Sequence, residues 1–322
     1  MTDFQQHIQL IREEVNRELA NLPIPENPKY LYDPVRYSLQ GVGKRFRPIL
    51  VHLTGRALDA NSDGLANLAL AVELLHTFTL IHDDIMDNDD TRHGLPTLHK
   101  KWDESTAVLA GDAIFVLAQL KVTLIETHAT EIMNYFNKIT LEICEGQAWD
   151  KEFENDLTIS EESYLKMIDC KTGALLGSCA ALPAIMEGLN DTTVQSLDQF
   201  GRQLGRGFQL QDDLLELISS PEEMGKSLGS DLAEGKQTYP VILARTQFEK
   251  EWNELTSHFQ SNLNGESLEA VKIFLNDSGI AQQTINKYES YFNEAQNALH
   301  IIPTEKRHDL ESLINLIQKR TY

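Results

Sequence analysis

The chain has 322 residues, with little cysteine, few positive charges and no long apolar run. Its three cysteines, Cys144, Cys170 and Cys179, lie in apolar, helix-like contexts without CxxC spacing. They are expected to be reduced core thiols of a cytoplasmic protein, because disulfides occur mainly in oxidising compartments. No run of 18 or more apolar residues occurs, so no integral membrane segment is expected. The N-terminal stretch MTDFQQHIQLIREEVNREL lacks the apolar centre of a signal peptide.

Positive charge is scarce, with 28 Lys and Arg against 49 Asp and Glu and a formal net charge of −21. Nucleic acids and anionic membranes attract basic surfaces, so this balance argues against both as partners. An acidic chain can still bind a phosphorylated substrate if local basic patches or divalent cations reverse the sign.

Apolar residues recur at helical spacing along most of the chain, and no convincing alternation of period two is found. With 41% hydrophobic residues and no low-complexity linker, residues 1–322 are expected to form one all-α domain. The long middle helices are apolar on more than one side, which is typical of the centre of a bundle. The expected helices are 3–20, 33–40, 44–58, 63–88, 104–126, 129–150, 160–187, 190–219, 239–247, 251–262, 266–275, 278–299 and 304–320.

Two acidic clusters with the same spacing end long apolar stretches: DDIMD, with Asp83, Asp84 and Asp87, and DDLLE, with Asp212, Asp213 and Glu216. Residues i and i+4 share a helix face, so the outer carboxylates of each cluster project together. Acidic runs are usually solvated faces, but apolar flanks place both clusters at the edge of a core. Two carboxylates about 4 Å apart repel by roughly 4 kcal/mol at an effective dielectric near 20, so two such clusters beside apolar surface need a cation. Oxygen ligands without His or Cys favour Mg²⁺ over zinc.

Basic residues alternate with these acidic clusters along the chain. GVGKRFRP places Lys44, Arg45 and Arg47 at the start of an expected helix, where glycines and cations suit a diphosphate. Taken singly, each basic residue can be an ordinary surface residue, but their alternation with two carboxylate clusters makes chance a poor explanation. The remaining basic positions lie beside a glycine or threonine or directly after the first cluster: Arg92, His93, Lys171, Lys226 and Lys236.

These motifs resemble the trans-prenyltransferases, the isoprenyl diphosphate synthases of the farnesyl and geranylgeranyl type. The resemblance extends from about residue 35 to residue 240 and rests on GKRFRP, ELLHTFTLIHDDIMDNDDTRHGLPT, AGD, KTGALLG, FQLQDDLLE and GKSLGSDLAEGKQTYP. It implies an all-α bundle around a central cavity, usually a homodimer, that uses about three Mg²⁺ ions. The implied reaction is the head-to-tail condensation of isopentenyl diphosphate with an allylic diphosphate. Apolar walls would keep water from the allylic cation.

The resemblance also implies a role for each matching residue. Direct metal contacts would come from three aspartates: Asp83, Asp87 and Asp212. Metal-bound water or the site geometry would depend on three more carboxylates: Asp84, Asp213 and Glu216. The allylic diphosphate would be held by Arg92, Lys171 and Lys226, with Gln209 and Lys236 nearby and Thr172 helping to stabilise the cation. Isopentenyl diphosphate would be held by Lys44, Arg47 and His76. The departing diphosphate would accept the proton.

Two positions depart from the family pattern. His93 stands where a second arginine is usual, so a neutral imidazole would replace a charged fork at isopentenyl diphosphate. Binding there should weaken or become pH-dependent. Glu216 stands where aspartate is usual, and its extra methylene is best tolerated in water-mediated coordination. Neither change removes an expected direct metal ligand, so activity is still expected.

Phe78 lies five residues before Asp83, about 7.5 Å along a helix at 1.5 Å per residue. In the family an aromatic side chain here acts as a floor against the growing chain, and Thr79 beside it is small. The combination resembles synthases that stop at geranylgeranyl diphosphate, with farnesyl diphosphate or longer products as alternatives. Phe78 can also be simply a core residue, since other helices could supply the floor.

Three other functions remain open. A terpene cyclase shares a DDxxD motif but leaves GKRFRP unexplained. A head-to-head synthase of the squalene kind carries DxxED pairs that are not found. A non-catalytic binding subunit of a two-component long-chain synthase usually loses the acidic motifs, whereas this chain keeps five of six aspartates.

Overall fold

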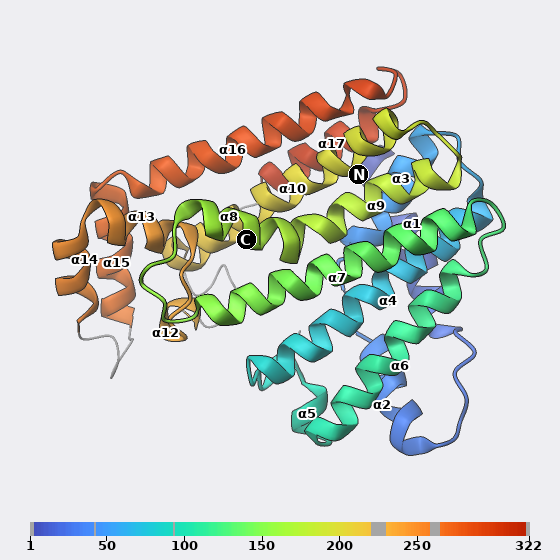
Figure 1. The fold of residues 1–322 in the computed structure, drawn as a ribbon, viewed down its shortest axis with the longest axis horizontal. Coiled ribbons are helices and arrows are strands. Elements are labelled where there is room, and N and C mark those ends of the chain that lie inside the picture. Colours follow the sequence, from blue (N-terminus) through green and yellow to red (C-terminus); the bar gives the residue numbers. More distant parts are fainter. Residues whose placement is uncertain (1–2, 42, 93, 220–229, 258–264, 320–322) are drawn as a thin grey trace. The chain divides into compact units, whose positions relative to one another are not determined.

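The computed structural model describes residues 3–41, 43–92, 94–219, 230–257 and 265–319, and this part of the chain is mostly helical (Figure 1). Within it, the strands form a single antiparallel hairpin of β1 (Thr91–Arg92) and β2 (Leu95–Pro96). The predicted all-α class is therefore confirmed. The hairpin was not predicted, because strands of two residues are too short to show alternation.

The chain divides into two compact units. Unit 1 comprises Met1–Thr140, Ser178–Leu197 and Ile301–Leu310, and unit 2 comprises Leu141–Gly177, Asp198–His300 and Glu311–Tyr322. Four of the five boundaries fall within α-helices, and the fifth falls within the 3₁₀ turn η2 (Leu299–Ile301). The four helices are α7 (Ala129–Phe153), α9 (Ala174–Met186), α10 (Asp191–Ile218) and α17 (His308–Gln318). The expectations of a single domain and of a central cavity stay predictions.

Unit 1 is centred on α4, which packs along α6 and α3 (Figure 1). Residues 68–75 of α4 are all buried, as expected for a helix surrounded by others. The helix begins after Asn61, whose side chain accepts hydrogen bonds from the backbone N–H groups of Asp63 and Gly64. The helices that lie wholly in this unit are α1 (Asp3–Ala20), α2 (Lys29–Leu39), α3 (Phe46–Ala57), α4 (Ser62–Met86), α5 (Leu98–Lys101) and α6 (Glu104–Val122).

By length and composition alone, α4 and α6 are apolar enough to cross a membrane. Core helices of water-soluble proteins pass the same test, and 56% of the most apolar stretch of α4 is buried, against 39% for α6. This is weak evidence for a membrane span. The expected absence of an integral membrane segment stays a prediction.

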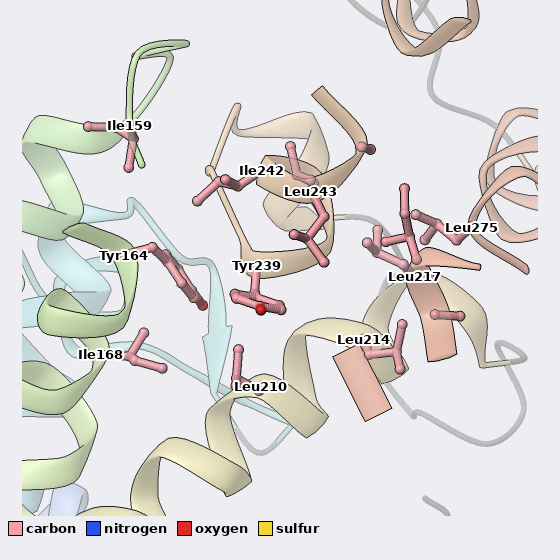
Figure 2. Close-up of a cluster of buried hydrophobic side chains, with 14 of the residues drawn as sticks. Ile159, Tyr164, Ile168, Leu210, Leu214, Leu217, Tyr239, Ile242, Leu243 and Leu275 are labelled. Atoms are coloured by element: carbon pink, nitrogen blue, oxygen red, sulfur yellow. The ribbon is translucent and has the colours of Figure 1, made fainter. Parts of the chain in front are cut away.

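Unit 2 has its own hydrophobic core, in which α8, α13 and the carboxyl-terminal half of α10 meet. Figure 2 shows Tyr164 of α8, Leu210 of α10 and Tyr239 of α13 gathered in this buried cluster. The segments wholly in this unit are α8 (Glu161–Ile168), the π-helical turn η1 (Asp169–Gly173), α12 (Ser230–Ala233), α13 (Tyr239–Gln247), α14 (Glu249–Thr256), α15 (Gly265–Asp277) and α16 (Ile280–Ala298). The short 3₁₀ turn η2 (Leu299–Ile301) follows α16.

Most predicted helices are present, with ends displaced by a few residues. The expected continuous helix over residues 160–187 is wrong in one respect, because η1 interrupts it with a wider turn. Cys170 and Cys179 are buried free thiols as expected, but Cys144 is exposed, so its prediction as a core residue is wrong. Helical periodicity places apolar residues on a face but does not show which face becomes buried.

Candidate functional site

In unit 1, the first acidic cluster lies at the carboxyl end of α4. Asp83 and Asp84 are in the last turn, and Asp87 caps the helix, its backbone N–H donating to the carbonyl of Asp83 at 2.8 Å. This end carries the negative pole of the helix dipole, and its last turn holds no basic residue. Carboxylates at such a position are electrostatically unfavourable without a cation, so the local charge fits a divalent metal.

Asp84 differs from its two neighbours because it is buried. Its carboxylate accepts a 2.5 Å hydrogen bond from Nε of Arg92 in the hairpin, and Arg92 also pairs with Asp89 at 3.3 Å. Burial raises the pKa of Asp84 to about 6, although Arg92 lowers it in part. Asp83 and Asp87 are partly exposed. The predicted metal residue Asp84 and the predicted diphosphate residue Arg92 therefore hold each other, which fixes the hairpin at the helix end.

Arg47 and His76, both expected at isopentenyl diphosphate, lie together in unit 1. Nη1 of Arg47 is 2.9 Å from Nε2 of His76. Nε of Arg47 is buried and has no hydrogen-bond partner among the described residues. Burial lowers the pKa of the Arg47 guanidinium, while Glu73 and the Cys179 thiol oppose this shift. A buried, unsatisfied N–H donor on a cation suits an anionic ligand.

Arg45, which belongs to the same motif as Arg47, has different partners. It precedes α3 with φ of 52°, in the left-handed region, and its side chain is buried against Glu73, with an N···O distance of 2.5 Å. It also donates to Asn16 at 2.8 Å and to the carbonyl of Gly41. Lys44, one residue earlier, is exposed. Of the three basic residues in GKRFRP, Arg45 is thus structural, and Lys44 and Arg47 are available for substrate.

Arg45→Ala is expected to lower the free energy of unfolding by about 3 kcal/mol or more, because it leaves Glu73 buried without its charge partner. Equilibrium unfolding in urea measures the change. Lys44→Ala is the matched control, since the same motif loses an exposed cation, and its unfolding midpoint should stay at the wild-type value. Near-wild-type stability of Arg45→Ala would contradict the structural role.

Phe78 is partly buried and packs between two rings. Its centroid lies 5.2 Å from that of Phe115 in α6 and 4.7 Å from that of His82. His82 in turn lies against Gly111, where a Cβ atom would come within 2.4 Å of Nε2. The Phe78 ring is therefore held in place without being fully buried, which is compatible with both the floor and the core interpretation.

In unit 2, the second acidic cluster lies in the last turns of α10, which also end without a basic residue. Asp212 is partly exposed and Asp213 is buried. Asp213 accepts hydrogen bonds from the Tyr164 hydroxyl and, at 3.0 Å, from Nε2 of Gln209. Burial raises the pKa of Asp213 to about 7, while these two hydrogen bonds lower it in part. In each cluster the second aspartate, Asp84 or Asp213, is thus buried and hydrogen-bonded, and the aspartate before it is partly exposed.

The raised pKa of Asp213 predicts a pH-dependent stability. The ordinary value of 3.8 applies to the unfolded chain and about 7 to the folded one. Between pH 3.8 and about pH 7 the folded state binds more protons than the unfolded state, so the free energy of unfolding falls as pH rises. Asp213→Asn cannot ionise and should therefore lose less stability than wild type between about pH 5 and about pH 8. Melting both proteins in EDTA tests this, and identical pH dependence in the two would contradict the raised pKa.

Lys171 and Thr172, predicted at the allylic diphosphate, both lie in the π-helical turn η1 of unit 2. Nζ of Lys171 is 2.5 Å from Asp150 of α7, and the Thr172 hydroxyl is 3.1 Å from Oε1 of Gln209. Gln209 therefore links Thr172 to Asp213. Turns of π geometry are rare and often occur at functional sites.

Glu216 and Lys236 meet at the short helix α12. Glu216 accepts the backbone N–H of Asp231 at 2.9 Å, and Nζ of Lys236 lies 3.2 Å from Asp231 and 3.1 Å from Glu234. Burial alone would raise the pKa of Asp231, but hydrogen bonds with Glu216 and the charge of Lys236 outweigh it and lower the pKa. Lys226 and His93 lie outside the described residues.

The sequence did not point to Asp150, Tyr164 or Asp231, which contact predicted site residues. Asp150 carries no comparable signal, because it lies within α7 and its partner Lys171 is 21 positions away. Tyr164 resembles any core aromatic until its hydroxyl is seen on Asp213. Such partners depend on tertiary contacts rather than on spacing.

The two acidic helix ends bear on which metal the protein can hold. No three His, Cys, Asp or Glu side chains there are grouped closely enough to hold an ion by themselves. Each acidic helix end nevertheless offers partly exposed carboxylate oxygens. Mg²⁺ commonly takes one or two carboxylates and completes its shell with water and phosphate oxygens. The residues present therefore fit a magnesium–diphosphate complex better than a metal held by protein alone.

An all-α fold with two acidic helix ends and nearby cations is the arrangement expected of an enzyme of isoprenoid diphosphates. Residues 28–277 match the family model of the polyprenyl synthetases. The chain is 38% identical over 284 residues to geranylgeranyl diphosphate synthase of Methanosarcina mazei, covering 87% of this chain and 86% of that one. The chain therefore belongs to the polyprenyl synthetase family.

Two further relatives broaden the comparison. Geranylfarnesyl diphosphate synthase of Natronomonas pharaonis is 33% identical over 332 residues, which cover 97% of this chain and 96% of that one. Polyprenyl synthase of Caulobacter crescentus, solved with calcium and isoprenyl diphosphate, has a TM-score of 0.88 and 26% identity, covering 99% of this chain and 98% of that one. The likeness thus extends over nearly the whole chain.

Proposed function

We propose that this protein is a Mg²⁺-dependent head-to-tail trans-prenyltransferase that condenses isopentenyl diphosphate with an allylic diphosphate to make geranylgeranyl diphosphate. The observation that carries the proposal is the repeated design of two helix ends in a member of this family. The ends of α4 and α10 each combine one anchored, buried aspartate with a partly exposed neighbour. Bound Mg²⁺ would neutralise the negative charge that develops on the leaving diphosphate.

The site residues fall into three groups in this reaction: those that bind metal and those that bind each of the two diphosphates. Asp83, Asp87 and Asp212 would contact Mg²⁺ ions directly, and Arg92 would bind the allylic diphosphate after exchanging part of its contact with Asp84. Lys171 and the undescribed Lys226 are assigned to the same diphosphate, and Lys44, Arg47 and His76 to isopentenyl diphosphate. The allylic C1–O bond breaks, and the isopentenyl double bond supplies the electron pair for the new bond to C1. The proton then lost goes to the departing diphosphate, and no protein base is required.

The product assignment rests on two observations. Phe78 stands one to two helical turns before Asp83 with its ring held by Phe115 and His82. The relative from Methanosarcina mazei is a geranylgeranyl diphosphate synthase. The Natronomonas relative makes a product one isoprene unit longer by name, so a longer product is the main alternative. Farnesyl diphosphate and a non-catalytic binding subunit are the others.

We also propose that the protein is a cytoplasmic homodimer. One side of α6 exposes apolar side chains, with Leu109, Val116 and Leu120 each at least 46% exposed. Their spacing of seven and four residues puts them on one helix face. Exposed apolar stripes of this kind mark interaction surfaces, and two-fold pairing is the commonest arrangement. Sedimentation velocity measures the oligomeric state directly.

The purified protein should convert isopentenyl diphosphate and an allylic primer to geranylgeranyl diphosphate with Mg²⁺ present, and EDTA should abolish turnover. Chromatography of the dephosphorylated products identifies the chain length. Dimethylallyl, geranyl and farnesyl diphosphates are compared as primers. Absence of turnover would favour the binding subunit, and cyclic products would favour a cyclase.

A further inference from the structure

The π-helical turn η1 is an unusual way to present two site residues. It spans Asp169–Gly173 between α8 and the start of α9, and it contains Lys171 and Thr172. A π turn accommodates one more residue than an α turn and is less favourable, so something outside the turn must stabilise it. The contacts around Asp169, its first residue, supply that stabilisation.

Both carboxylate oxygens of Asp169 are bound by arginines of α10. Nη1 of Arg202 lies 3.2 Å from Oδ2, and Nε of Arg206 lies 2.9 Å from Oδ1. The two arginines are four residues apart, so they project from the same face of α10. All three side chains are at most 25% exposed. The first residue of the turn is therefore held at two points from one neighbouring helix.

Arg202 is itself held from α7. Its two terminal nitrogens lie 2.7 Å and 2.9 Å from the two oxygens of Glu142, a bidentate pair, and its Nε lies 2.8 Å from Asp198. Burial alone would lower the pKa of Arg202, but the hydrogen bonds of Glu142 and three nearby carboxylates raise it. A bidentate arginine pair fixes direction as well as distance. Glu142 thus orients the arginine that holds η1.

The backbone of η1 is also tightly packed. A Cβ atom on Gly146 of α7 would lie 2.3 Å from the backbone nitrogen of Lys171. A Cβ atom on Gly205 of α10 would lie 2.8 Å from the Cα of Gly173. Glycine at these two positions allows a close approach that any other residue would prevent. The turn therefore has little freedom to shift once Asp169 is held.

We infer that Asp169, held by Arg202 and Arg206, is a positioning residue that fixes η1 so that Lys171 and Thr172 meet the allylic diphosphate. This inference rests on the proposed function. Buried ion pairs are weak evidence for stability alone, since apolar replacements often serve as well. Here the charges converge on the one turn that carries both site residues, which favours a geometric role.

Asp169→Asn tests the inference, because it replaces one carboxylate oxygen by an amide group facing an arginine. The expected result is an increase of about tenfold or more in KM for the allylic diphosphate, with KM for isopentenyl diphosphate within about twofold of wild type. Asp169→Glu, which keeps both oxygens, should recover part of the loss. A role in stability alone would not separate the two KM values.

Asp198→Asn is the matched control. Asp198 also pairs with Arg202, but it lies in α10 itself, four residues away, and does not contact η1 through that pair. Its allylic KM should stay within about twofold of wild type while its melting temperature falls about as much as that of Asp169→Asn. Equal effects of the two variants on KM, or an unchanged allylic KM in Asp169→Asn, would overturn the inference.

Two further measurements keep the test decisive. If Asp169→Asn does not fold, Arg206→Gln removes one of the two contacts to Asp169 and is assayed in its place, with the same expected separation of KM values. The affinity for inorganic pyrophosphate with Mg²⁺ is measured by calorimetry in parallel, and Asp169→Asn should weaken it about tenfold. Failure of wild-type turnover would contradict the proposed function, whereas equal pyrophosphate affinity in wild type and variant would contradict the role of Asp169.

Discussion

Replacing Asp83 by alanine is expected to lower kcat/KM by about a thousandfold while making the metal-free protein slightly more stable. Loss of one group that stabilises charge developing in a transition state typically costs 10²–10³-fold, and loss of a metal ligand belongs at the upper end. The stability should rise by about 0.3–1 kcal/mol, because a negative charge is removed from the carboxyl end of α4. Steady-state kinetics and melting in EDTA measure the two quantities.

Opposite signs for activity and stability distinguish a functional carboxylate from a structural one. Asp90→Ala is the control, because Asp90 is acidic and nearby but its side chain is 83% exposed and pairs with Lys100. It should change kcat/KM less than about twofold, as expected for a surface ion pair. Wild-type turnover in Asp83→Ala, or an equal loss in Asp90→Ala, would contradict the metal assignment.

Phe78→Ala is expected to lengthen the main product by at least one isoprene unit. The side chain is partly buried and borders the rings of Phe115 and His82, so its removal opens space along α4 without emptying a sealed core. The acidic helix end lies more than a turn away and should keep its geometry, so the rate of the first condensation should change little. Chromatography of dephosphorylated products gives the length distribution.

The matched control for Phe78 is Thr77→Ala, one position earlier on α4. The Thr77 hydroxyl donates to the carbonyl of Glu73 at 2.8 Å, so its loss affects the helix locally and leaves the aromatic contacts intact. Its product should be that of wild type. An unchanged product in Phe78→Ala would show that the ring is a core residue and that another helix limits the chain.

The sequence was sufficient to predict where the two acidic helices end, but not which side chains contact the aspartates there. Apolar runs ending in DDIMD and DDLLE predicted where α4 and α10 would stop, because periodicity and charge are local properties. The choice of Asp84 and Asp213 as the buried members depended on Arg92 and Tyr164. These contacts span 8 and 49 positions along the chain, and no spacing rule covers them.

In GKRFRP, too, the sequence predicted the local structure but not the partners of the side chains. The motif correctly predicted a helix start with basic residues, yet the left-handed φ of Arg45 turns its side chain to Glu73. Arg47, two residues later, is directed to His76 instead. Sequence alone treats the three cations as equivalent, because only the backbone conformation separates them.

The π-helical turn also makes a prediction about insertions and deletions. In an α-helix each residue turns the chain by about 100°. Removing one residue from η1 would restore regular α geometry and rotate Lys171 and Thr172 relative to Tyr164 in α8, whose ring lies in the core of unit 2. The two site residues and the Tyr164 ring could not then all keep their present positions. We expect this five-residue segment to tolerate no change in length, so its register is a structural constraint in its own right.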